Sequence, residues 1–210
     1  MQSYDVVIVG AGPAGLNCAE KLAGSGKTVL VLEQKDVVGP KVCAGGLTKK
    51  DIDYLKLPNK LVGRRFGEFS LHTPNQNIAV ELGDSFISTV DRKELGQWQL
   101  EKILKLGATV KVSSKVTKIC KNHVVVNNSE KIGFRHLVGA DGSASVVRKH
   151  IGLEVSDLGM AIQYIIPTKK YRKLEAFLDS DIFHSWYCWI FPHRDFVSIG
   201  CGGNPRLISP

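Results

Sequence analysis

The sequence predicts an α/β fold in which a parallel-sheet domain is interleaved with strands of an antiparallel sheet. One observation is an apolar run at 4–9 that enters a glycine-rich turn and is followed by a helical pattern and a second apolar run at 29–32. The other is a series of strand patterns at 160–167, 186–192 and 196–200 with no long helical pattern between them. The first arrangement is typical of a Rossmann-like unit, and the second of an antiparallel sheet.

The glycine-rich turn has the spacing of a dinucleotide-binding loop. Gly10 permits a tight turn after the strand, Gly12 lets the backbone approach a pyrophosphate, and Gly15 lets the helix pack closely against the strands. Pro13 and Ala14 begin the helix, whose free N–H groups and partial positive charge attract phosphate. We therefore expect these five residues to bind the phosphates of a cofactor.

An acidic residue ends the second apolar run. Glu33 lies about 20 residues after the turn, where a carboxylate accepts hydrogen bonds from a ribose hydroxyl, and Gln34 follows it as a further cofactor contact. Because an acid repels a 2′-phosphate, the site is expected to take FAD or NAD rather than NADP. The alternative is a glycine-rich turn without a ligand, but the agreement of strand, helix, second strand and acid favours the nucleotide.

The composition is that of an ordinary globular protein. The 210 residues are 43% hydrophobic and 23% charged, which suits one large or two small domains, and no apolar run is long enough to cross a membrane. A core strand begins near the N-terminus, so no signal peptide is expected. Five cysteines without metal-ligand spacing predict reduced thiols, a cytoplasmic location and no metal site: Cys18, Cys43, Cys120, Cys188 and Cys201.

The positive charge is concentrated in one segment. The net charge is +8, and residues 91–150 alone hold 12 Lys/Arg against 5 Asp/Glu, a net of +7. We interpret this as a solvated lysine-rich surface; the alternative is attraction to anionic lipid headgroups or an acidic partner. Nucleic acid is not expected as a partner, because the basic residues are spread over several elements without interleaved aromatic side chains.

The remaining elements are predicted from local patterns. Asp91 caps a helix that runs to about Gly107, with Leu100, Ile103 and Leu104 on one face. The other expected elements are a loop at 40–46, a short helix at 48–55, a hairpin of 66–73 with 77–82, strands at 109–113, 115–120, 123–127 and 135–139, and a brief helix ending at 150. We expect a discontinuous cofactor domain (1–62 and 89–152) and a partial substrate domain (63–88 and 153–210).

A second strand–turn–helix string occurs at 138–148, with the sequence Val-Gly-Ala-Asp-Gly-Ser-Ala-Ser-Val-Val-Arg. Asp141, followed by Gly142, can hold backbone N–H groups or a ribose at the start of a helix. The string resembles the second conserved motif of the FAD-dependent hydroxylase superfamily, whose fold is that of p-hydroxybenzoate hydroxylase. Asp91-Arg92, before Gln97-Trp98, also resembles that superfamily.

This resemblance implies that the cofactor is FAD. It implies that Arg92 lies near the phosphate and ribityl portion of the flavin; the alternative is an ion pair at the helix start. Val116 is also expected among the cofactor contacts.

Two further strings resemble those of the geranylgeranyl reductase family. Lys41-Val42-Cys43-Ala44-Gly45-Gly46-Leu47 resembles its Cys-x-Gly-Gly loop. Tyr187-Cys188-Trp189-Ile190-Phe191-Pro192, followed by Gly200-Cys201-Gly202, resembles its Tyr-x-Trp-x-Phe-Pro and Gly-x-Gly signature. The family saturates isoprenoid double bonds in archaeal lipid precursors, chlorophyll side chains or quinones. The resemblance implies a flavoprotein oxidoreductase that transfers hydride from FAD to a geranylgeranyl-type C=C bond of a prenyl or lipid substrate.

The resemblance also assigns residues to the site. Lys41, Cys43, Ala44, Gly45 and Gly46 are expected to contact the flavin. A thiol beside the flavin can supply the proton that completes alkene reduction, so Cys43 is the candidate catalytic residue; the alternative is an inert buried cysteine.

The aromatic string supplies the candidate substrate contacts. Tyr187, Trp189, Phe191 and Pro192 are expected to line an apolar slot for the isoprenoid chain, with Cys188 on the opposite face; the alternative is an ordinary aromatic core. The electron donor is expected to be NAD(P)H or ferredoxin, and the substrate class leaves peripheral membrane contact open.

The chain departs from the family at its C-terminus. Family members continue well beyond the Gly-x-Gly signature, with a later Gly-Asp motif at the ribityl chain and the rest of the substrate domain, so we expect a truncated chain or a partner that supplies the remainder. Two alternative functions stay open: a flavin monooxygenase or halogenase of an aromatic substrate, and an FAD-binding fragment without turnover.

Overall fold

The computed structural model describes residues 1–83, 85–155, 158–204 and 206. The chain divides into two compact units, Met1–Pro40 with Lys93–Ser156, and Lys41–Arg92 with Asp157–Pro210. The boundaries expected from the sequence differ mainly at 41–62, which we assigned to the first domain and which the structure groups with the second unit. No helix in the part of the chain that the structure describes is long and apolar enough to cross a membrane.

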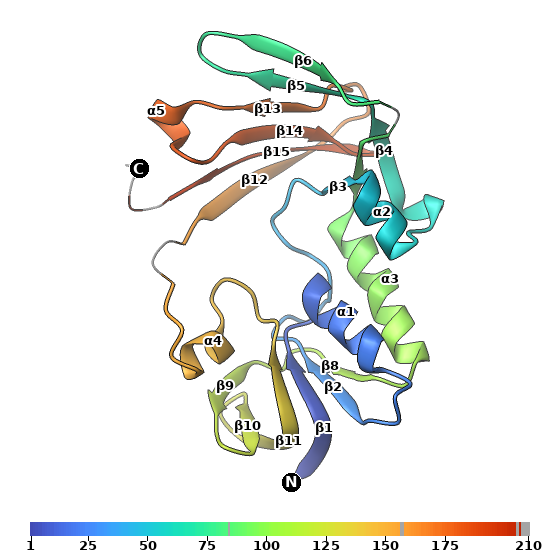
Figure 1. Cartoon of the computed structure of the whole chain (residues 1–210), viewed down its shortest axis with the longest axis vertical. Helices are drawn as coiled ribbons and strands as arrows, with labels where there is room; N and C mark the ends of the chain where they lie inside the picture. The colour runs from blue at the N-terminus through green and yellow to red at the C-terminus, as the bar shows by residue number, and fades with distance from the viewer. Residues whose placement is uncertain (84, 156–157, 205, 207–210) are drawn as a thin grey trace. The chain divides into compact units, whose positions relative to one another are not determined.

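The first unit is built on a six-stranded sheet in the order β8-β2-β1-β11-β10-β9 (Figure 1). β8, β2, β1 and β11 run parallel to one another, and β10 is antiparallel to both β11 and β9. The elements of this unit are β1 (Gln2–Val9), α1 (Pro13–Leu22), β2 (Val29–Leu32), α3 (Arg92–Lys105, whose first residue belongs to the second unit), β8 (Thr109–Lys111), β9 (Val116–Ile119), β10 (His123–Val126), β11 (Glu130–Gly139) and α4 (Val146–His150). β2 and the last four residues of β1 are apolar and buried, as expected where both faces of a parallel sheet are covered.

Each face of this sheet has its own core. Ile8, Leu16 and Ile103 belong to the core that includes α1 and α3, while Leu30 and Ile132 belong to the core on the other face. The Lys102 ammonium lies 2.7 Å from the Glu20 carboxylate and links α3 to α1.

The buried face of α3 differs from the expected one. Leu95, Gly96, Gln99 and Ile103 are buried, whereas Leu104 is 49% exposed. Positions 95, 99 and 103 repeat every four residues and therefore share one face, and each residue advances about 100° around a helix. Of the residues expected on one face, Ile103 is therefore in the core and Leu100 packs against it, whereas Leu104 points away from it.

The second unit is built on a six-stranded sheet in the order β12-β15-β14-β13-β5-β6 (Figure 1). It also has a three-stranded sheet in the order β3-β7-β4. All pairs in the larger sheet are antiparallel except β13 with β5. The elements are β3 (Gly46–Thr48), α2 (Lys49–Leu55), η1 (Asn59–Leu61), β4 (Val62–Phe66), β5 (Glu68–His72), β6 (Asn77–Glu81), β7 (Ile87–Val90), β12 (Met160–Pro167), β13 (Glu175–Phe177), α5 (Ser180–Phe183), β14 (Cys188–Pro192) and β15 (Phe196–Gly203).

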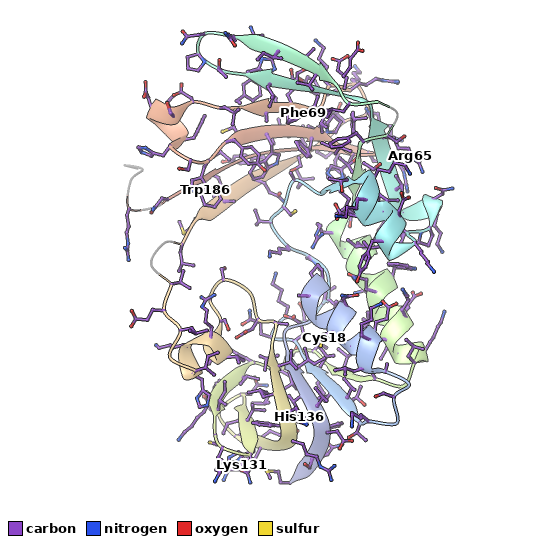
Figure 2. The ribbon with its side chains drawn as sticks, in the orientation of Figure 1. Cys18, Arg65, Phe69, Lys131, His136 and Trp186 are labelled. Carbon is purple, nitrogen blue, oxygen red and sulfur yellow. The ribbon has the colours of Figure 1, made fainter. Side chains whose placement is uncertain are left out.

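The antiparallel sheet and the hairpin of β5 with β6 are confirmed. The sequence did not predict β3, β4, β7 and β13 as strands. These strands have three to five residues each, which is too short for alternation to distinguish them from loops. Phe69 on β5 and Trp186 just before β14, both labelled in Figure 2, belong to the aromatic side chains of this unit.

Candidate functional site

Two glycines of the dinucleotide turn are required by the packing of the first unit itself. Gly10 has φ +100°, and a Cβ there would lie 2.4 Å from the carbonyl oxygen of Ala140. A Cβ on Gly15 would lie 1.9 Å from the carbonyl oxygen of Gly10. The turn therefore packs directly against the first turn of α1 and against the end of β11, and both approaches need a residue without a side chain.

Gly12 is different. Its φ is −73°, which any residue adopts, and no other part of the described chain lies within 4 Å of the position that its Cβ would take. The next residue, Pro13, begins α1, whose N-terminus has no side-chain cap among the described residues. Open space above a glycine and an uncapped helix N-terminus fit a bound pyrophosphate, which needs close backbone approach and free N–H donors.

Glu33 braces the turn. Its Oε2 accepts a hydrogen bond from the Ala11 N–H, and its Oε1 accepts one from the Lys35 N–H, each at 2.9 Å. A carboxylate has about four acceptor sites, so both oxygens can still accept a bond from a ribose hydroxyl. Glu33 therefore fixes the turn relative to β2, a contact that we did not predict. Gln34 beside it is exposed.

Asp141 caps α4. Its Oδ1 accepts from the Ser145 hydroxyl at 2.6 Å, and its Oδ2 accepts from the N–H groups of Val146 at 2.6 Å and Val147 at 3.3 Å. The sequence left two roles open for Asp141, binding backbone N–H groups or binding a ribose. The carboxylate binds backbone N–H groups here, and Oδ1 can still accept a hydrogen bond from a second donor. Gly142, the next residue, has φ +80° and open space at its Cβ position.

The Cys43 loop is held by side chains of the large sheet in the second unit. The Cys43 N–H donates to Gln163 Oε1 on β12 at 3.0 Å. The Cys43 sulfur accepts a hydrogen bond from the Gly45 N–H at 3.4 Å. The thiol is half-buried.

His193 anchors the same loop from the end of β14. Its Nε2 lies 2.9 Å from the carbonyl oxygen of Ala44, and its ring stacks on Phe196 at 4.2 Å. Because a carbonyl only accepts, Nε2 must carry the proton. His193 is only 4% exposed, and this burial lowers its pKa, so the ring is neutral near pH 7. A Cβ on Gly45 would lie 2.6 Å from the His193 ring, which explains the glycine there.

The aromatic string is connected to the Cys43 loop by hydrogen bonds. Trp189 Nε1 donates to the Ser198 hydroxyl at 3.0 Å, and the Ser198 hydroxyl donates to Gln163 Oε1 at 3.4 Å. Gln163 Oε1 is the atom that also accepts from the Cys43 N–H. The two strings that resemble the geranylgeranyl reductase family therefore meet in the structure at Gln163, a residue outside both strings.

Burial separates the predicted substrate residues. Trp189 and Phe191 are only 5% and 8% exposed, and they form a core with Leu174. Pro192 is also buried. Tyr187 precedes β14, is 42% exposed, and contacts the Trp189 ring edge-on with 6.1 Å between centroids. In the described residues Tyr187 is thus the accessible member of the string, above a packed aromatic layer.

Three predicted cofactor contacts lie in different surroundings. Arg92, at the start of α3, has a buried Nε with no hydrogen-bond partner among the described residues. A buried, unsatisfied donor of this kind suits an absent anionic or hydrogen-bonding ligand. Lys41 is exposed, and Val116 is part of the first unit's core.

Sequence reasoning did not find Gln163 and His193. Gln163 sits among apolar residues of β12, and His193 follows the Phe-Pro pair of the aromatic string. The signal for Gln163 is a polar residue within an otherwise apolar strand. The signal for His193 is its position directly after the aromatic string.

Comparisons with known proteins agree on one class. A family model described as an FAD binding domain matches residues 3–205. An uncharacterized protein of Methanosarcina barkeri is 31% identical over 95% of this chain and 54% of its own length. A geranylgeranyl diphosphate reductase of Rhodobacter capsulatus is 27% identical over 95% of this chain and 54% of its own. The chain spans about half the length of these curated relatives.

The fold is also that of solved crystal structures. A geranylgeranyl bacteriochlorophyll reductase-like protein of Thermoplasma acidophilum superimposes with a TM-score of 0.86 and 23% sequence identity, covering 100% of this chain and 59% of the other. The expected α/β fold with an antiparallel sheet is confirmed.

Proposed function

Because the chain belongs to the FAD-binding domain family and FAD is its cofactor, we propose that it is an FAD-dependent oxidoreductase that reduces isoprenoid C=C bonds of a prenyl or lipid substrate. One observation carries the proposal. Gln163 links the Cys43 loop to Trp189 through Ser198, so the two strings that distinguish geranylgeranyl reductases form one hydrogen-bonded group in this chain. The similarity to relatives named geranylgeranyl reductase supports it.

Each unit has residues that we propose to contact FAD. The glycine turn, with Pro13 and Ala14, would hold the pyrophosphate, and Glu33 and Asp141 would each accept one ribose hydroxyl in addition to their present donors. We assign the remaining contacts to Gln34, Lys41, Cys43, Ala44, Gly45, Gly46, Arg92, Val116 and Gly142. The open space at Gly12 and the unsatisfied Arg92 Nε support this assignment.

Cys43 would supply the proton of the reaction. Bound reduced FAD supplies hydride, and saturating an isolated double bond also requires a proton on the second carbon. The Cys43 thiol can donate that proton as a general acid. The Gly45 N–H points at the Cys43 sulfur, where it stabilises the negative charge that remains once the proton has left.

The aromatic layer would bind the apolar chain of the substrate. Tyr187 is accessible for contact with an isoprenoid, and its ring contacts that of Trp189. Trp189 packs in the same core as Phe191, and Pro192 is also buried, so these three would contribute to the slot from the buried side. The electron donor for such an enzyme is NAD(P)H or ferredoxin. A lipid substrate brings the protein into peripheral contact with a membrane.

The test uses the 210-residue chain reconstituted with FAD. The flavin is reduced chemically without oxygen, and a geranylgeranyl lipid is added. We expect a mass gain of two hydrogens for each double bond reduced, with Cys43→Ser losing this activity and keeping its flavin spectrum. Cys120→Ser is the matched control, because Cys120 is also half-buried but lies in the first unit. A reconstituted protein that binds FAD and leaves the lipid mass unchanged would contradict the proposal.

The glycine turn and the Asp141 string also favour a second function, since both resemble the flavin hydroxylases. A monooxygenase or halogenase of an aromatic substrate would form a flavin hydroperoxide when its reduced form meets oxygen. Stopped-flow spectra that show this species, together with an unchanged lipid, would favour that function. Stoichiometric FAD with neither reaction would identify an FAD-binding fragment without turnover.

A further inference from the structure

We propose that Cys188 and Cys201 form a reversible disulfide site that spans β14 and β15. The two residues are direct cross-strand partners in the antiparallel pair, and both are free thiols, half-buried. Neither residue belongs to the site described above, and the proposal does not depend on the proposed function.

The backbone geometry suits a disulfide. The Gly202 N–H donates to the Tyr187 carbonyl at 3.1 Å, which makes 187/202 a hydrogen-bonded pair. Pair types alternate along an antiparallel ladder, so Cys188 and Cys201 form a non-hydrogen-bonded pair, whose Cα atoms lie about 4.5 Å apart. Disulfides span Cα separations of about 4.4–6.8 Å. The bond can therefore form without a shift of the backbone.

The surroundings isolate this pair from the other cysteine of the second unit. Phe177 on β13 is opposite Cys188, and Ile162 on β12 is opposite Cys201, so apolar side chains flank the thiols within the sheet. Trp189 and Gln163, the residues that lead to Cys43, are the next residues along their strands and point to the other face. Cys43 is therefore held on the face opposite to the pair.

The two thiols have unequal roles in the exchange. Burial raises the pKa of Cys188 to about 12, and the neighbouring Cys201 adds to the effect, so Cys188 keeps its proton while Cys201 attacks first. The oxidant is a small-molecule disulfide of the glutathione type. The Cys201 sulfur bonds to one sulfur of that disulfide, whose S–S bond breaks, and the first glutathione leaves and takes up a proton.

The second step closes the bond. The Cys188 sulfur attacks Cys201 in the mixed disulfide, the Cys188 proton passes to the second departing glutathione, and the protein disulfide forms. In total the two cysteines lose two electrons and two protons, and the oxidant gains both as two thiols.

The test equilibrates the whole chain in oxidised and in reduced glutathione buffers, quenches with acid, and labels free thiols with N-ethylmaleimide under denaturing conditions. The chain has five free cysteines. Because two of them are linked after oxidation, the oxidised sample should carry three labels and the reduced sample five. Trypsin cuts after Lys173, Arg194 and Arg206, so the disulfide should join peptide 174–194 to peptide 195–206.

Variants check the order of attack. In Cys188→Ser the mixed disulfide cannot resolve, so glutathione should accumulate on Cys201. In Cys201→Ser the remaining thiol is Cys188, and we expect less glutathione to accumulate on it. Cys120→Ser should form the 188–201 bond as the wild type does. Five labels in the oxidised wild type, or a peptide link to any other cysteine, would overturn the proposal; this readout needs no variant to fold.

Discussion

The glycine turn at 10–15 and the loop at 43–46 are both short runs of small residues, yet they are held in opposite ways. The turn is fixed mainly by close packing of backbone atoms, as where Gly15 meets the Gly10 carbonyl, and the nearby Glu33 carboxylate adds a hydrogen bond to the Ala11 N–H. The loop is fixed by side chains from distant parts of the sequence, Gln163 at a separation of 120 residues and His193 at 149.

This difference determines how each segment should respond to substitution. Where backbone atoms pack this closely, as at Gly10 and Gly15, there is no room for an added Cβ, so these two glycines are the positions where substitution should destabilise the turn. A loop held by distant side chains is sensitive at those side chains as well as at its own Gly45, and each anchor contributes about one hydrogen bond. Each prediction below tests one side of this comparison.

The largest effect is expected from Gly15→Ala. A Cβ at this position would lie 1.9 Å from the Gly10 carbonyl oxygen, and because that atom is backbone, either the turn or α1 must move. Overpacking of a core costs about 1–3 kcal/mol, and we expect a loss of stability at or above the upper end of this range. Urea denaturation followed by circular dichroism measures it. An unchanged midpoint would show that backbone packing does not hold the turn.

Gly12→Ala is the matched contrast within the same turn. Its Cβ meets no other part of the described chain and its φ is −73°, so the variant should unfold at the same urea concentration as the wild type. The added methyl group occupies the space above the turn, and we expect FAD affinity to fall at least about tenfold, or about 1.4 kcal/mol. Flavin fluorescence titration gives the affinity; normal binding would contradict a pyrophosphate at Gly12.

Gln163→Leu tests the loop. It leaves the Cys43 N–H without its acceptor, which costs about 1–3 kcal/mol for a buried donor. The lost hydrogen bond lowers the free energy that is needed to open the loop locally. We therefore expect iodoacetamide to alkylate Cys43 roughly tenfold faster in this variant than in the wild type, with Cys18 as the internal reference. Gln163→Glu keeps an acceptor at the same place and should restore the slow rate. Equal rates in all three proteins would show that the loop does not depend on Gln163.

The comparison also explains how much of the molecule could be predicted from the sequence. The parallel strands and the turn were predictable, because Gly10, Gly15 and Glu33 act within one contiguous stretch whose spacing reflects its geometry. The hairpin of β5 with β6 was predictable for the same reason, since its turn residues lie between two alternating runs.

The anchors of the Cys43 loop were not predictable in this way. Gln163 and His193 gain their roles only when β12 and β14 are placed in one sheet with β15 between them. Nothing in the local sequence of either strand specifies that partner. The short strands β3 and β7, which follow the loop and pair with each other, depend on the same long-range order and were missed for the same reason.

His193→Phe should remove a dependence of stability on pH. Burial lowers the pKa of His193 from its ordinary value of 6.5, so the unfolded chain binds more protons between that value and the lowered one. Stability from this group is therefore complete above about pH 6.5 and is lost as the pH falls toward the folded pKa. Asp91 and Arg64 are the charged groups that act on the ring, with opposite signs.

Urea midpoints at pH 7.5 and pH 5 measure this effect. The variant should lose about 1 kcal/mol at pH 7.5, where its ring cannot donate to Ala44, and should lose less than the wild type on acidification. His72, whose pKa is raised by its bond to Asn77 and then by Glu175, contributes stability below pH 6.5 that is lost above it. His72 is present in both proteins, so it cancels in the difference. Parallel pH curves would show that His193 is not buried in its neutral form.

The smallest effect is expected from Asp141→Ala. This variant tests whether a side chain also stabilises part of the first unit, here the start of α4. It removes the acceptor of the Ser145 hydroxyl and of the Val146 and Val147 N–H groups, and loss of a helix cap costs about 1 kcal/mol. Ser145→Ala is the control, since it loses its own cap to the Arg148 N–H and leaves the Asp141 carboxylate in place. Both variants should therefore be less stable in urea by similar amounts.

Only Asp141→Ala should also bind FAD less tightly, by less than about tenfold, because Oδ1 has one remaining acceptor site for a ribose hydroxyl. Equal FAD affinities in the two variants would mean that Asp141 acts on α4 alone and does not contact the cofactor.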